Sequence, residues 1–80
     1  MRLDKYLKVS RIVKRRTLAR DFAENGRVLV NDKIAKPATI VKIGDIITIQ
    51  VGDRKNSYEV LEVKENVRAN EAESLYRIIE

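Results

Sequence analysis

The chain opens with two short stretches in which apolar residues recur at helical spacing. Leu3, Tyr6 and Leu7 stand at positions i, i+3 and i+4, which lie on one face of a short helix. Asp4 is near the start of this stretch, where a negative charge interacts favourably with the helix dipole. The second apolar stripe comprises Leu18, Ala19, Phe22 and Ala23.

End signals bound the second helix. Thr17 precedes the apolar stripe and is a suitable N-cap, and Gly26 follows Asn25 as a C-terminal stop. Residues 10–16 form a basic connector that could add a further helical turn. The pattern therefore predicts two short helices joined by a tight connector.

From Val28 onward the apolar period changes to two, which is typical of strands. Val28 and Val30 face one way, Asn31-Asp32 is a turn signal, and residues 33–35 return as a short strand. An extended segment or short strand over residues 41–45 then leads into a turn at its end.

The second half of the chain predicts the rest of a sheet. The strongest strand signal is Ile46–Val51, and residues 52–56 form a polar turn before a returning strand at 58–63. Residues 64–74 are acidic and polar, with a helical turn around Ala72, and a last strand follows at 75–79. The expected fold class is α+β: two short N-terminal helices packed on a small, mostly antiparallel sheet.

Length and composition narrow the classes of function. Eighty residues indicate one domain over 1–80, with a core motif in about residues 1–50 and sheet completion plus an acidic segment in 51–80. The chain has no cysteine and no histidine, which excludes zinc fingers, Cys nucleophiles and Ser-His-Asp triads. We therefore expect no metal, no cofactor and no enzymatic activity. No apolar run is long enough to span a bilayer and no signal-peptide core is present, so we expect a cytoplasmic protein without a membrane partner.

Charge is concentrated at the N-terminus. The first 20 residues carry a net charge of +7, whereas the whole chain carries +5 and residues 56–80 carry −3. A concentrated cationic surface on a small protein most often binds nucleic acid. The candidate RNA-binding residues are Arg2, Lys5, Lys8, Arg11, Lys14, Arg15, Arg16 and Arg20.

These residue types suit a folded RNA backbone. Lys and Arg neutralise phosphates, and the planar arginine fork can hold a phosphate through two N–H groups. Bases in A-form RNA are hidden, so recognition of shape and phosphate is expected. The four aromatic residues are too few for a single-strand stacking platform, and Tyr6 and Phe22 fit a core better than a base contact.

Each candidate also has a plainer interpretation. Arg15 and Arg16 could be the solvated end of a connector, and some of the lysines must lie on the far side of a helix. Asn31 fits turn chemistry, and Asp4 fits either a helix cap or a partner that orients a neighbouring arginine. The acidic C-terminal segment could dock a basic protein or be a solvated face.

The N-terminal pattern resembles the RNA-binding domain named after small-subunit ribosomal protein S-four. The resemblance covers roughly residues 1–50 and is specific in combination. It is carried by Arg2-Leu3-Asp4-Lys5-Tyr6-Leu7, the basic run to Arg16, Thr17-Leu18-Ala19-Arg20, Gly26-Arg27-Val28-Leu29-Val30-Asn31, and Val41 through Gly44-Asp45. It implies RNA binding, with Arg2 on the RNA face.

The whole chain is also similar to the RqcP (YabO) family of ribosome-associated quality-control factors. This resemblance implies binding to rRNA of an obstructed large ribosomal subunit and to its peptidyl-tRNA, in support of alanine tailing by a separate factor. We expect the protein to be a monomer. A general rRNA-binding assembly or heat-shock factor is the alternative. A helix-turn-helix DNA-binding protein is disfavoured, because the basic connector is longer than a three- to four-residue turn.

Overall fold

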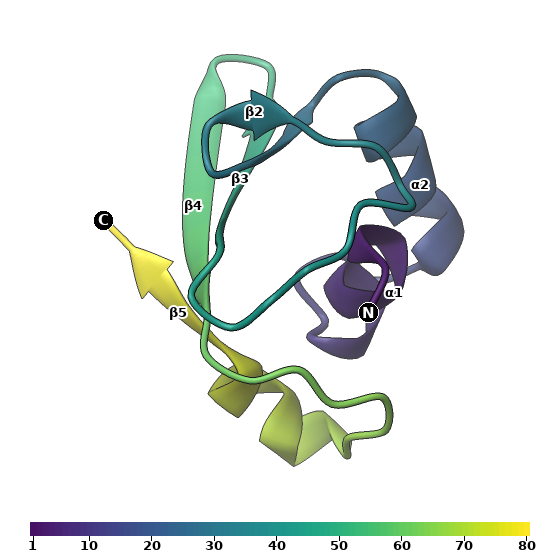
Figure 1. Cartoon of the computed structure of the whole chain (residues 1–80), viewed down its shortest axis with the longest axis vertical. Helices are drawn as coiled ribbons and strands as arrows, with labels where there is room; N and C mark the ends of the chain where they lie inside the picture. The colour runs from purple at the N-terminus through teal and green to yellow at the C-terminus, as the bar shows by residue number, and fades with distance from the viewer.

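The computed structural model describes all residues, 1–80, and arranges two helices beside a five-stranded sheet (Figure 1). The elements are α1 (Leu3–Val9), α2 (Arg16–Glu24), β1 (Val28–Val30), β2 (Lys33–Ile34), β3 (Ile46–Val51), β4 (Arg54–Val60), the 3-10 helix η1 (Ala69–Leu75) and β5 (Tyr76–Ile79). The strand order is β2-β1-β3-β4-β5, and every neighbouring pair is antiparallel. The α+β prediction is confirmed.

The core lies between the helix pair and one face of the sheet. Its largest helical members are Leu3, Tyr6 and Leu7, which confirms the predicted face of α1. The second predicted stripe is partly wrong: α2 buries Ala19 and Ala23, Phe22 is half-buried, and Leu18 is 41% exposed. The two alanines have small side chains, so α2 packs close to α1 and only a narrow stripe of α2 is buried.

The connector between the helices is not helical. Arg11 adopts a left-handed backbone with φ of 62°, which ends α1 and turns the chain back. The N–H of Val13 then donates to the Leu7 carbonyl at 3.0 Å. The N-cap of α2 is Arg15, in extended conformation, and Thr17 lies inside the helix, so the predicted N-cap is wrong by two residues. No side chain caps α2.

The turn between β1 and β2 forms as the sequence predicts. Asn31 and Asp32 both have positive φ, 53° and 68°, as a two-residue hairpin turn requires. The Asn31 side chain accepts from the Ile46 N–H at 2.9 Å and donates to Asp45 at 3.1 Å, so it joins this hairpin to the 41–45 segment. That segment forms no strand of its own, and it contains a turn that is closed by the hydrogen bond from the Asp45 N–H to the Lys42 carbonyl at 3.1 Å.

The β3–β4 hairpin is tighter than predicted. Val51 pairs with Arg54, so the turn is only Gly52-Asp53, and Gly52 takes a φ of +59° there. Residues 54–56 belong to β4, since antiparallel pairing to β3 outweighs their polar composition. The strand ends at Val60, and Leu61 leaves the sheet to donate to the Leu75 carbonyl at 2.8 Å. The predicted helical turn around Ala72 is η1, and the last predicted strand is β5.

One hydrogen bond ties α1 to the C-terminal part of the chain. The buried Tyr6 hydroxyl donates to the Leu75 carbonyl at 2.7 Å, and burial raises the pKa of Tyr6. Tyr6→Phe should lower the free energy of unfolding by about 1 kcal/mol, the usual net value of one hydrogen bond. The loss stays small because Leu75 still accepts from the Leu61 and Glu62 N–H groups. Urea unfolding measures it, and a loss above about 3 kcal/mol would contradict this interpretation.

Candidate RNA-binding site

Two of the predicted RNA-binding arginines meet at a buried carboxylate. Asp4 is fully buried in the first turn of α1. Arg2 approaches it with Nε 3.2 Å from Oδ1 and Nη2 3.4 Å from Oδ2. The Nε of Arg16, the first residue of α2, lies 3.5 Å from Oδ2. Thus Arg2 and Arg16, which are 14 positions apart in sequence, are held side by side by Asp4.

The Asp4 carboxylate stays ionised despite its burial. Burial alone would raise its pKa, but the Arg16 contact and charge, the hydrogen bond from the Lys5 N–H and the Arg2 charge together lower the pKa below the ordinary 3.8. The Lys5 N–H donates to Oδ1 at 2.8 Å. The interpretation of Asp4 as a residue that orients an arginine is confirmed, and it orients two. Asp4 does not cap the helix, because the N-cap position of α1 is Arg2.

The lowered pKa of Asp4 predicts an acid-dependent loss of stability. A carboxyl with a pKa lower in the folded than in the unfolded state adds stability that is present above the unfolded pKa and is lost as pH falls through the folded pKa. The free energy of unfolding of the wild type should therefore exceed that of Asp4→Asn most above about pH 5, and the difference should shrink below about pH 4. Urea unfolding from pH 7 to pH 2 measures it; a difference that does not vary with pH would contradict the ionised state of Asp4.

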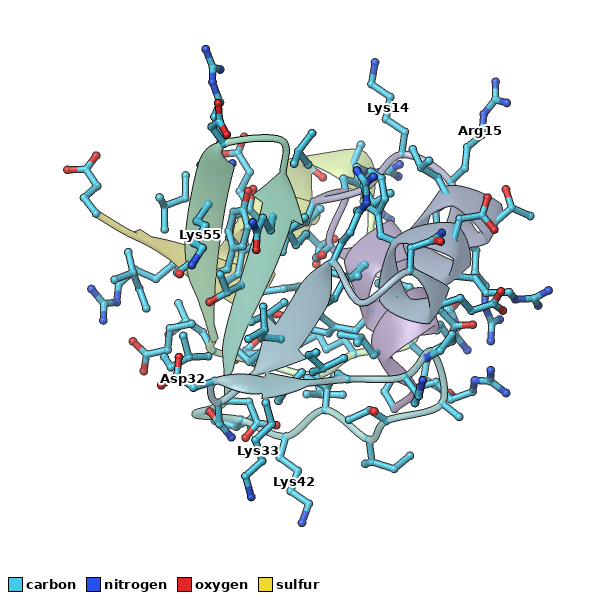
Figure 2. The ribbon with its side chains drawn as sticks, turned by 90° about the horizontal axis from the view of Figure 1, so that it is seen from above. Lys14, Arg15, Asp32, Lys33, Lys42 and Lys55 are labelled. Carbon is cyan, nitrogen blue, oxygen red and sulfur yellow. The ribbon has the colours of Figure 1, made fainter.

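Lys14 and Arg15 form a second pair, at the end of the connector. Both are exposed, neither is in an ion pair, and Figure 2 shows their side chains extending from the same side of the molecule. They line a shallow hollow of about 370 Å³ together with Thr17, Leu18 and Asp21. A shallow, open hollow with two unpaired cations suits a phosphodiester backbone better than a small molecule.

Leu18 is the residue of this surface that sequence reasoning missed. Helical spacing assigned it to the core, yet it is 41% exposed in the wall of the hollow. An exposed leucine between cations can contact a ribose or a base. One signal in the sequence indicated this exposure: Ala19 and Ala23 can form the buried face of α2 by themselves, which leaves Leu18 outside it.

The other predicted site residues are more dispersed. Lys5 pairs with Glu65 at 3.2 Å and is half-buried, so part of its charge is already neutralised. Lys8 is half-buried in the last turn of α1, while Arg11 and Arg20 are exposed. The structure thus joins Arg2 with Arg16 and Lys14 with Arg15, and it joins Lys5 to an acid.

Several other charges lie away from this surface or are paired with one another. Lys33 and Lys42 extend from the side opposite Lys14 and Arg15 (Figure 2). Glu59 pairs with Arg77 across β4 and β5, and Glu62 pairs with Lys64 at 3.2 Å. No group of acidic, cysteine or histidine residues could hold a metal ion, and no helix is long and apolar enough to cross a membrane.

Comparisons with known proteins identify the family of this chain. The S4 domain family matches residues 1–47, which include α1, the connector, α2 and the β1–β2 hairpin. A relative from Halalkalibacterium halodurans named "RQC P-site tRNA stabilizing factor" is 51% identical over 98% of this chain and 89% of its own length. One of the same name from Streptococcus pneumoniae is 47% identical over 99% and 90%.

A solved structure gives the same fold over nearly the whole chain. The trimeric Heat Shock Protein 15 of Vibrio cholerae superposes with a TM-score of 0.89 at 39% identity, covering 99% of this chain and 81% of that one. The match includes α1, the connector and α2. The chain belongs to the S4-domain family and, within it, to the family of RQC P-site tRNA stabilizing factors.

Proposed function

We propose that this protein binds a large ribosomal subunit obstructed by peptidyl-tRNA and stabilises that tRNA while a separate factor adds alanines to the stalled chain. The observation that carries the proposal is the full-length match to proteins named for P-site tRNA stabilisation. It is supported by the cationic surface of α1, the connector and α2, which suits structured RNA. Because this role requires ribosomes, the protein acts in the cytoplasm.

The binding surface consists of the eight basic residues of the first 20. Arg2 and Arg16 act as a pair of forks at the starts of the two helices, and Lys14 and Arg15 contact the backbone beside them. One copy of the chain supplies Arg2, Asp4 and Arg16, so we propose that a monomer binds. The protein acts by holding RNA in position rather than by catalysis. The eight residues are Arg2, Lys5, Lys8, Arg11, Lys14, Arg15, Arg16 and Arg20.

Sedimentation tests this function. Lysates with a tagged copy of the protein are separated on sucrose gradients, with and without a reporter message that stalls translation. The protein should appear with large subunits that retain peptidyl-tRNA, and be scarce on intact ribosomes, because the small subunit covers the interface where tRNA is held. Puromycin, which releases the nascent chain from peptidyl-tRNA, is the control and should reduce the signal. Sedimentation only with small subunits would overturn the proposal.

A general heat-shock or assembly factor is the second candidate, favoured by the match to Heat Shock Protein 15 at a TM-score of 0.89. The two functions differ in their need for tRNA. Equal binding to empty large subunits and to subunits with peptidyl-tRNA would favour the second candidate. Competition by duplex DNA as effective as that by rRNA would instead support the DNA-binding alternative.

A further inference from the structure

Asp4 is a buried charge at the centre of an otherwise cationic surface. It is the only buried acid of the chain, and its side chain has no exposed area. An ionised carboxylate at such a site is costly unless it is paired and hydrogen-bonded. All of its partners are donors from the RNA-binding surface itself: Arg2, Arg16 and the Lys5 N–H.

The way the arginines meet Asp4 leaves donors free. Arg16 approaches with Nε, and Arg2 with Nε and one terminal nitrogen. Their side chains remain 45% and 47% exposed. A guanidinium carries five N–H donors, so each arginine that binds a carboxylate through its Nε edge still presents N–H groups outward. One carboxylate therefore holds two guanidinium groups side by side. We call this pair a clamp, because both groups can bind the same anion.

We propose that Asp4 is a positioning residue for RNA binding: its carboxylate fixes Arg2 and Arg16 as one clamp for a backbone phosphate. The inference rests on the proposed RNA-binding function and assigns the phosphate as the ligand of this pair. Fixing two long side chains before binding removes the entropy cost of ordering them on the RNA. Although Asp4 is negatively charged, it thereby strengthens the binding of the RNA phosphate.

This role and a purely structural one predict opposite results for Asp4→Asn. The substitution raises the net charge by one, from the present +5. If Asp4 only repels RNA or only stabilises α1, folded Asp4→Asn protein should bind RNA as tightly as the wild type or more tightly. If Asp4 positions the arginines, the same protein should bind more weakly despite its added positive charge.

The experiment measures the Kd for deproteinised large-subunit rRNA by filter binding at several salt concentrations. Asp4→Asn should raise Kd on the order of tenfold, the loss expected for an unfixed arginine pair. Glu24→Gln is the matched control, since Glu24 is an exposed acid on α2 without an ion pair and its neutralisation changes the net charge equally. That variant should bind at least as tightly as the wild type.

Repeating the substitution in a variant that lacks both arginines separates a positioning role of Asp4 from a role in folding. With Arg2→Ala and Arg16→Ala in place, Asp4→Asn should not weaken RNA binding further, because it has no arginine left to position. If Asp4→Asn does not fold, Arg2→Lys with Arg16→Lys replaces it: both charges remain, but the Nε donors are lost, and Kd should rise by a similar factor. Unchanged or tighter binding by folded Asp4→Asn, or by the lysine pair, would overturn the positioning role. Failure of the wild type to bind the rRNA would overturn the proposed function, and the role of Asp4 with it.

Discussion

Replacing Lys14 and Arg15 together by glutamate is expected to raise the Kd for structured rRNA on the order of 100-fold while the protein stays folded. The two side chains extend from one side, are exposed and make no ion pair (Figure 2). Exposed charges of this kind seldom change the free energy of unfolding by more than about 0.5 kcal/mol. Arg16 is left intact, because a glutamate there would face the buried Asp4 carboxylate and would destabilise the fold.

The matched control is the reversal of Lys33 and Lys42. This pair is also exposed and without an ion pair, and it extends from the opposite side of the molecule (Figure 2). Each double reversal lowers the net charge by four, from +5 to +1. General attraction to a polyanion predicts similar losses for the two variants, whereas a defined surface predicts a loss below about fivefold for the control. Filter binding at fixed salt measures both, and equal losses would contradict the site assignment.

Alanine tails on stalled chains should vanish when the gene is deleted, and a copy with Arg16→Ala should not restore them. Arg16 is the first residue of α2 and the partner of Asp4, so its loss removes half of the clamp. Loss of one charge-assisted phosphate contact costs about 1.5–3 kcal/mol, equivalent to roughly 10- to 150-fold in affinity. The lengths of tails on a stalling reporter give the measurement.

Lys33→Ala provides the control for this complementation. It also removes one cation, but from the side opposite Lys14 and Arg15 (Figure 2), and it should restore the tails. Immunoblots establish that both variants accumulate equally. Tails of normal length in the deletion strain would show that tailing does not depend on this protein, while leaving its binding to RNA in place.

The sequence predicted those elements whose signals are local. Gly26 ends α2 and the Asn31-Asp32 turn forms because both signals specify a backbone conformation directly, and Ile46–Val51 is β3 because its residues are strongly strand-forming. Predictions were wrong where partners distant in sequence decide the outcome. Residues 54–56 are polar, yet they pair with β3, and Leu18 is exposed because two alanines already fill the contact with α1.

The candidate site was likewise predictable from the sequence only in part. Charge density selected the eight basic residues as candidates, but it could not rank them. Which of these residues are paired with an acid depends on contacts between separate parts of the chain. Glu65 lies 60 positions after Lys5, and Arg16 reaches Asp4 only through the packing of α1 on α2. Asp4 itself differs from an ordinary first-turn acid only through its burial, which periodicity does not reveal.

The hydrogen bond from Tyr6 to Leu75 spans 69 positions, and Leu75 is also fully buried beneath α1. Contacts of such high sequence separation form late, since the loop between them must close first. In folding, the packing of α1 on the C-terminal part of the chain is therefore expected to follow the contacts between α1 and α2 and between β3 and β4, whose residues are closer in sequence.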